Sequence, residues 1–430
     1  MTKWRIIGIM TGNSMDAIDM VLTEFDGERI RDICSFSQPY SATQKNEIDS
    51  LRRRIIEQKL TAEDLLKDTR FINVHWRYIE GVADAVNKMC AQYGLNKQRI
   101  DAIGFHGKTL DHNPPSMAAA NGEEPYTIQM GSAQLLANLT GLPVINDFRS
   151  ALLQQGYEGA PLAAPHNANM AKTEGDGCYF NAGNTSNLAW IKDGQALISW
   201  DAGPFNEYTD SFVRQIKGEA MDFDAAYGKK GKLMPDLLQY LFDVGREYYE
   251  LLPPKSGDPA YYKTAQIFAH IAEKYGNVQK SRSLFYNVTR TFEHFAGYLA
   301  AYAIGQTPEN IELTPQIILF GGGWRNPVAL KAFKDSLNKG EVLSEHESHF
   351  VNLRARFGKK PQIKYSDFGT FMEARLFADL ARYYLEQKGW PLPELQGKTL
   401  VLGQLRTPFG APVDDFLSAA ARGWQKDKRN

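Results

Sequence analysis

The chain opens with the stretch Arg5-Ile6-Ile7-Gly8-Ile9-Met10-Thr11-Gly12-Asn13-Ser14-Met15-Asp16, an apolar run followed directly by a small polar loop. A second apolar run, 17–25, and the turn Asp26-Gly27 come next. The same order recurs in the middle of the chain, where 177–181 leads into Ala182-Gly183-Asn184-Thr185-Ser186-Asn187, then into 188–192 and Asp193-Gly194. Each copy predicts a strand, a loop, a strand and a turn. Two such copies predict two similar domains.

The composition of these loops leaves two interpretations open. A loop of Gly, Ser and Asn between two strands can direct backbone N–H groups toward a phosphate. Two ordinary β-hairpins would give the same pattern, because Gly-Asn turns are common in hairpins.

Length, charge and cysteine content exclude several classes of protein. The chain has 430 residues, enough for two or three domains. A formal net charge of -1 provides no broad basic face, so we expect no nucleic-acid partner. The cysteines Cys34, Cys90 and Cys178 lack metal-binding spacing and predict buried thiols in a reducing compartment. No apolar run approaches the roughly 20 residues that span a bilayer. We therefore expect a cytoplasmic protein without a membrane partner.

Strands and helices alternate along the chain, which predicts an α/β fold in two domains, with a Gly- and Pro-bearing junction at 154–165. The predicted strands are 5–10, 17–25, 30–40, 100–105, 127–130, 142–146, 179–181, 188–191, 196–200, 317–320 and 362–365. The predicted helices are 41–57, 70–93, 132–140, 205–217, 234–249, 283–305, 327–338 and 370–388. The long amphipathic helix 283–305 either packs in a core or provides the interface of a homodimer.

The residues with catalytic potential cluster at predicted strand ends, where ligands bind in open α/β sheets. Asp201 ends a predicted strand and precedes Ala202-Gly203-Pro204. A carboxylate held on a rigid strand end suits a general base, while an Asp here equally suits the N-cap of the next helix. Lys108 and Arg149 also follow strands, and each is a candidate for an anionic group or for surface ion pairing.

Gly321-Gly322-Gly323 lies between a predicted strand and a predicted helix. Three residues without Cβ atoms let a nucleotide approach the backbone, although a turn with positive φ has the same requirement. Asp16 and Glu373 are the acidic residues near the proposed phosphate loops, where we expect Mg²⁺.

A series of motifs resembles the 1,6-anhydro-N-acetylmuramic acid kinases, whose relatives include the levoglucosan kinases. The stretch from Gly12 to Asp19 resembles their Gly-Thr-Ser-x-Asp-Gly-x-Asp signature. The further matches follow in the family's order and run to about residue 380: Gly104 to Thr109, Gln129 to Gly131, Asn146 to Arg149, Gly159 to Leu162, Asn181 to Asn187, Asp201 to Asn206, Pro254 to Gly257, Gly321 to Asn326 and Met372 to Ala374.

The resemblance implies the sugar kinase, Hsp70 and actin superfamily: two duplicated actin-like ATPase (ribonuclease H-like) domains with ATP in a central cleft. The domains would be 1–150, with the helix at 366–388 packing back on it, and 151–365, followed by an extension at 389–430. The resemblance also implies an enzyme that uses ATP and Mg²⁺ to open the 1,6-anhydro bridge of a small anhydrosugar with water and to phosphorylate O6. This is a step of peptidoglycan recycling.

Residue roles follow from the resemblance. Asp201 is the expected base that activates water. The expected phosphate contacts are Gly12, Asn13, Ser14 and Asp16 in one loop and Gly183 and Asn184 in the other. Gly321, Gly322 and Gly323 are expected near the adenosine, Asp16 and Glu373 at Mg²⁺, and His106, Lys108, Arg149, Glu158 and Phe205 near the sugar.

Six positions depart from the family pattern: Asn13, Ala17, Lys108, Glu158, Asn184 and Phe205. Lys108 and Glu158 change the charge expected near the substrate and are candidates to pair with each other. The departures leave two alternatives to the muramyl sugar kinase. One is a kinase of the same fold for another anhydrosugar, and the other is a catalytically weakened protein that binds sugar or nucleotide.

Overall fold

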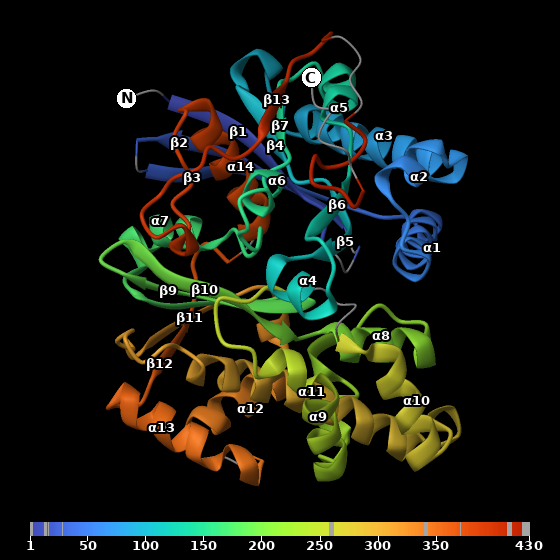
Figure 1. Ribbon diagram of the computed structural model, residues 1–430, viewed down its shortest axis with the longest axis vertical. Helices are drawn as coiled ribbons and strands as arrows, with labels where there is room; N and C mark the ends of the chain where they lie inside the picture. Colours follow the sequence, from blue (N-terminus) through green and yellow to red (C-terminus); the bar gives the residue numbers. More distant parts are fainter. Residues whose placement is uncertain are drawn as a thin grey trace. The chain divides into compact units, whose positions relative to one another are not determined.

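The computed structural model describes residues 3–12, 15, 17–27, 29–257, 262–338, 343–369, 371–410 and 415–423. The predicted site residues Asn13, Ser14 and Asp16 lie outside this set. The chain forms two compact units. The first combines Met1–His166 with Phe371–Asn430, and the second is Asn167–Thr370. Figure 1 shows the helices and strands of both.

The sheet of the first unit has the strand order β13-β7-β4-β1-β2-β3. β1 (Lys3–Met10), β2 (Ala17–Asp26) and β3 (Arg29–Pro39) form an antiparallel meander, as predicted. β4 (Ala102–Phe105) runs parallel to β1, and β7 (Val144–Asn146) runs parallel to β4. β13 (Gln404–Arg406) adds an antiparallel edge strand that the sequence patterns did not predict.

The second unit repeats this topology with the order β10-β9-β8-β11-β12. β8 (Gly177–Ala182), β9 (Thr185–Lys192) and β10 (Gln195–Pro204) form the second antiparallel meander. β11 (Gln316–Phe320) and β12 (Gln362–Tyr365) continue the sheet in parallel. Counted along the chain within each large sheet, the first five strands therefore lie in the order third, second, first, fourth, fifth in both units. The predicted duplication of a ribonuclease H-like fold is confirmed.

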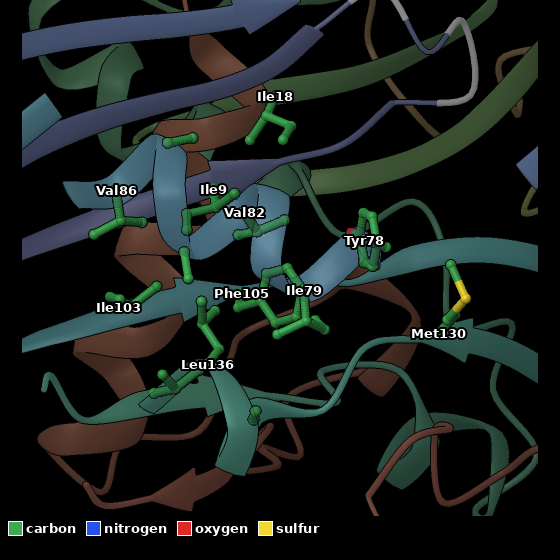
Figure 2. Packing of buried hydrophobic residues seen from close by; sticks show 14 of the residues in the cluster. Ile9, Ile18, Tyr78, Ile79, Val82, Val86, Ile103, Phe105, Met130 and Leu136 are labelled. Carbon is green, nitrogen blue, oxygen red and sulfur yellow. The ribbon is translucent and has the colours of Figure 1, made fainter. Parts of the chain in front are cut away.

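Alternation of side chains along β1 forms two cores in the first unit, because successive residues of a strand face opposite sides. Ile7 and Ile9 join one apolar cluster, in which α3 (Thr69–Gln92) covers the sheet. Figure 2 shows part of this cluster, with Val82 and Val86 of α3 near Ile9 of β1 and with Tyr78 further along the helix.

The other face of this sheet packs against α14 (Met372–Leu385), which Figure 1 draws beside β1 and β2. A Cβ added at Gly8 would lie 1.8 Å from the carbonyl oxygen of Ala374, and one at Gly104 would lie 2.0 Å from that of Phe377. The two glycines therefore allow α14 to lie directly on the strands of this sheet.

The remaining elements complete the two units. The other helices of four or more residues in the first unit are α1 (Ala42–Gln58), α2 (Ala62–Lys67), α4 (Pro115–Asn121), α5 (Ala133–Thr140) and α6 (Ser150–Leu153), and α7 (Ala164–Glu174) crosses into the second. The second unit adds α8 (Glu207–Lys217), α9 (Pro235–Tyr249), α10 (Thr264–Tyr275), α11 (Arg282–Gly305), α12 (Pro327–Asn338) and α13 (Glu347–Phe357). β5 (Lys108–Asn113) and β6 (Tyr126–Met130) form a separate antiparallel pair.

The long helix α11 is a core element of the second unit. Most of its side chains from Phe285 to Ile304 are buried, and Gly297 lets it approach the backbone of α12 at Ala329. Helix α11 therefore packs in the core and does not provide the interface of a homodimer. The homodimer itself stays a prediction. In the part of the chain that the structure describes, no helix is long and apolar enough to cross a membrane.

Candidate active site

Asp201 lies within β10, and its carboxylate is held in place by a neighbouring loop. The side chain is only 7% exposed. Its Oδ2 accepts hydrogen bonds from the Ser256 hydroxyl at 3.1 Å and from the Gly257 N–H at 3.0 Å. The backbone N–H of Asp201 donates to the Lys255 carbonyl, and its carbonyl accepts from the Tyr248 hydroxyl. These contacts hold the carboxylate in a fixed orientation.

Two details of the Asp201 prediction are corrected. The residue does not end its strand, because β10 continues to Pro204 and pairs with β9 again beyond an irregularity between Asp201 and Gly203. The N-cap of α8 is Asn206. The interpretation of Asp201 as the cap of that helix is therefore wrong.

The loop that holds Asp201 was matched to a family motif in the sequence, but no role was predicted for its residues. Lys255 is 1% exposed, and its ammonium donates to the carbonyls of Tyr248 and Tyr249 and to Oε1 of Gln306. Burial lowers the pKa of Lys255 to about 7, and the charge of Asp201 opposes this change. The three acceptors fix the loop so that Ser256 and Gly257 face Asp201. The sequence signal for this loop is Pro253-Pro254-Lys255-Ser256-Gly257, a lysine between two prolines and a Ser-Gly pair.

The second polar loop, Gly183-Asn184, is tied to the start of α8. The Gly183 carbonyl accepts from the Asn206 N–H at 3.2 Å, and the Asn184 carbonyl accepts from the Phe205 N–H at 2.8 Å. The Asn184 amide donates to Glu207 Oε2 at 2.6 Å. The Asn184 side chain, one of the departures from the family pattern, thus lies toward the first turn of α8.

The three glycines after β11 have three different environments. Gly321 has φ 90° and ψ 153°, and a Cβ there would lie 2.4 Å from Asn181 Oδ1. A Cβ at Gly323 would lie 2.7 Å from the Phe205 ring. At Gly322 a Cβ would meet no atom within 4 Å. The turn explains Gly321 and packing explains Gly323, whereas only Gly322 presents backbone to open space.

Phe205 is 2% exposed and packs edge-on against Trp324, with ring centroids 4.7 Å apart. Its ring lies under Gly323, inside the second unit. This burial accounts for the large apolar side chain, and the sugar contact predicted for Phe205 stays a prediction.

In the first unit, His106 and Arg149 contact each other. Arg149 Nε and Gln129 Nε2 each lie 3.1 Å from His106 Nε2, and His106 Nδ1 lies 3.1 Å from the Gly107 carbonyl. Burial, and then the charge of Arg149, hold the pKa of His106 well below its usual value. The imidazole is therefore neutral, with the proton on Nδ1 and with Nε2 as the acceptor. Two residues predicted near the sugar are thus brought together.

Lys108 lies at the first polar loop. The side chain is 1% exposed, and its ammonium donates to the Gly12 carbonyl at 2.8 Å. The adjacent Thr11 hydroxyl donates to the Gly107 carbonyl at 2.9 Å and lies 2.8 Å from the Tyr78 hydroxyl. The start of β5 and the loop after β1 are therefore joined, and Lys108 places a cation beside Gly12.

Glu158 has a structural contact of its own. Its carboxylate accepts from the backbone N–H of Ser116 at 3.1 Å and from the Ser116 hydroxyl at 2.7 Å, at the start of α4. Burial raises the pKa of Glu158, and burial together with the charge of Glu158 raises the pKa of Glu394 to about 7. These contacts give Glu158 a role in fixing the loop before α7, while the suggested pair with Lys108 stays a prediction.

Of the two metal ligands predicted from the sequence, only Glu373 lies among the described residues. Glu373 is exposed in the first turn of α14, and Asp16 lies outside the described set. Within the described ranges, no group of three or more His, Cys, Asp or Glu side chains is arranged to hold a metal ion. The assignment of Asp16 and Glu373 to Mg²⁺ stays a prediction.

Comparison with known proteins gives consistent matches. Residues 4–354 match the family model described as anhydro-N-acetylmuramic acid kinase. An anhydro-N-acetylmuramic acid kinase of Vibrio vulnificus strain CMCP6 is 28% identical over 92% of this chain and 96% of its own length. One of Nitrobacter winogradskyi is 30% identical over 78% of this chain and 85% of its own length.

Among solved structures, a ROK hexokinase from Thermus thermophilus covers 90% of this chain and 100% of its own, at 15% identity. Its TM-score of 0.32 is too low to support any inference about this chain. The match to the family model covers most of the chain and includes the two polar loops, Asp201 and the glycine triplet. The chain therefore belongs to the anhydro-N-acetylmuramic acid kinase family, a family of ATP-dependent sugar kinases.

Proposed function

We propose that this protein uses water to open the 1,6-anhydro bridge of 1,6-anhydro-N-acetylmuramic acid and transfers a phosphoryl group from ATP to O6. The observation that carries the proposal is the Asp201 carboxylate, which is held by Ser256 and Gly257 in two motifs of the family. Asp201 takes a proton from water as the water oxygen bonds to the anomeric carbon. The bond from that carbon to O6 breaks, and O6 accepts the phosphoryl group.

The other residue assignments are part of the proposal. ATP supplies the γ-phosphoryl group, and Mg²⁺ would neutralise charge that develops on it. The loop residues Gly12, Asn13, Ser14, Gly183 and Asn184 would hold the phosphates. The open space at Gly322 supports a nucleotide contact at the triplet. The neutral His106 beside Arg149 supports a polar sugar contact there, since both side chains are fixed in place. The predicted cytoplasmic location is kept as part of the proposal.

Replacement of Asp201 by Asn tests the chemistry. The amide keeps the size of the side chain and can still accept from Ser256 and Gly257, but it cannot take a proton from water. We expect D201N to lose at least about 100-fold in kcat, the lower end of the usual contribution of a general base. ATP binding, measured by calorimetry, should change little.

The assay follows product mass for wild type and D201N with ATP, Mg²⁺ and the anhydrosugar. The proposed reaction adds one phosphoryl group and one water to the substrate, whereas simple phosphorylation adds only the phosphoryl group. Unchanged turnover in D201N would contradict the role of Asp201. A panel that includes levoglucosan, which lacks the lactyl acid, separates the muramyl substrate from other anhydrosugars. Nucleotide binding without turnover of any sugar would favour the binding protein.

A further inference from the structure

Residues 415–423, the C-terminal segment, lie beside β6 and form backbone hydrogen bonds with it. The Phe416 carbonyl accepts from the Gly131 N–H at 3.0 Å, the Ser418 N–H donates to the Gln129 carbonyl at 3.0 Å, and the Ala420 carbonyl accepts from the Thr127 N–H at 2.9 Å. Met130 and Leu417 form an antiparallel bridge. Leu417 and Ala421 are part of the same apolar core as α3 and β4. The C-terminal segment is thus built into the first unit.

Ser418 makes the most specific contact with β6. Its hydroxyl accepts from the Gln129 N–H at 3.0 Å and donates to the Thr127 carbonyl. Gln129 is the residue whose amide contacts His106. The Oε1 atom of Gln129 is buried, with no hydrogen-bond partner among the described residues. The orientation of this amide therefore depends on its bond to His106 and on the backbone position that Ser418 sets.

The segment also reaches the turn that carries Arg149. Asp147 has φ 58°, a left-handed conformation that is uncommon for residues other than glycine. Its carboxylate accepts from the Ser150 hydroxyl at 2.5 Å and from the Ala419 N–H at 2.9 Å, and the Ser150 hydroxyl accepts from the Ala420 N–H at 2.9 Å. One stretch of backbone therefore supports both sides of the His106–Arg149 pair.

We propose that the C-terminal segment positions the sugar-binding pair His106 and Arg149, with Ser418 acting through Gln129 and with Ala419 acting through Asp147. The inference rests on the proposed function for the identity of the sugar. The matched family model ends at residue 354, so this contribution comes from outside the matched region. Residues in this segment would be positioning residues, because their contacts to the sugar side run through Gln129 and Asp147.

The test uses Ser418→Ala in the full chain. Loss of the hydroxyl leaves the buried Gln129 N–H without its side-chain acceptor. One such hydrogen bond changes an equilibrium constant by about a factor of five. We expect KM for the anhydrosugar to rise about 3- to 10-fold, with KM for ATP unchanged. The ring ¹⁵N signals of His106, observed by NMR, should shift. Ser418→Thr, which keeps a hydroxyl, should restore both.

Asp415→Asn is the matched control. Asp415 lies in the same segment, and its carboxylate accepts from the Ser132 hydroxyl and the Gln134 N–H at the start of α5. It should lower stability without moving the His106 signals or the sugar KM. Two outcomes would overturn the inference. One is that D415N changes the sugar KM and the His106 signals as S418A does, and the other is that S418A leaves the His106 signals unchanged. Failure of the wild type to turn over any anhydrosugar would remove the proposed function, while the His106 signals would still decide the positioning.

Discussion

Gly321 and Gly322 are adjacent, but the fold requires glycine only at position 321. Gly321 lies in a backbone region used almost only by glycine, and Asn181 already occupies the space that a Cβ would need. Gly322 has neither constraint. We expect Gly322→Ala to leave the free energy of unfolding within about 0.5 kcal/mol of wild type, and to weaken ATP binding if the nucleotide lies on this backbone.

Gly321→Ala is the matched variant and should lose more than about 2 kcal/mol, from backbone strain and overlap with Asn181. Thermal unfolding checks the stability of both variants, and calorimetric titration with ATP checks binding. Normal ATP affinity in a stable G322A protein would remove the triplet from the nucleotide site.

The catalytic candidate could be located from the sequence, but its surroundings could not. Asp201 was identified by its place after an apolar run and by its motif. The contacts from Ser256 and Gly257 come from a loop about 55 residues further along the chain, and no periodicity connects the two. The neutral state of His106 likewise depends on burial and on Arg149, which only the folded chain brings together.

Asn326 links two elements of the second unit, and its removal should be costly. Its Oδ1 accepts from the N–H groups of Val328 and Ala329 at the start of α12, and its Nδ2 donates to Glu293 of α11 at 2.7 Å. We expect Asn326→Ala to destabilise the protein by about 1–2 kcal/mol, the usual cost of an N-cap. Urea unfolding gives the measurement.

Asn206→Ala is the comparison, because Asn206 occupies the N-cap of α8 but makes no side-chain capping bond. It should change stability by less than about 0.5 kcal/mol. Equal losses in the two variants would show that the capping bonds of Asn326 contribute little.

The strands and long helices were predicted more completely than the short or mixed elements. The apolar runs of the two meanders and the spacing of α3 and α11 carry clear periods. α10, α13 and β5 were not predicted. β5 holds Lys108, Asp111 and His112, all buried, so its sequence Lys-Thr-Leu-Asp-His-Asn lacks the apolar pattern of a strand. Its burial comes from packing that single-sequence patterns do not encode.

At the scale of the whole molecule, the free energy of unfolding should depend on pH, because buried basic and acidic side chains have shifted pKa values that change stability in opposite directions. Burial lowers the pKa of His75 and His294 to about 4, so their contribution is complete above about pH 6.5 and is lost as pH falls toward 4. Burial of Lys255, with a pKa of about 7, makes stability rise with pH above that value. Glu293 has the opposite effect on stability, which its raised pKa makes fall as pH rises.

Glu293 of α11 is 1% exposed, and burial raises its pKa to about 9, with a further increase from Asp222. The folded protein therefore keeps a proton that the unfolded chain releases near pH 4.5, and stability falls as pH rises from 4.5 to 9. Glu293→Gln keeps an acceptor for Asn326 and removes this titration. The stability of E293Q relative to wild type should increase with pH by up to about 1.4 kcal/mol per unit in that range.

Urea unfolding of wild type and E293Q at several pH values from 5 to 9 measures this difference directly, because the other titrating groups cancel. Glu312→Gln is the control. Glu312 is exposed, and its pKa is lowered by Lys192, so its variant should show a difference from wild type that does not change above about pH 5. A constant difference between E293Q and wild type across the range would mean that Glu293 is ionised in the folded protein. An ionised Glu293 buried against Gly228 would then require a cation or a water molecule at Oε2, because Oε1 accepts from Asn326 but Oε2 has no hydrogen-bond partner among the described residues.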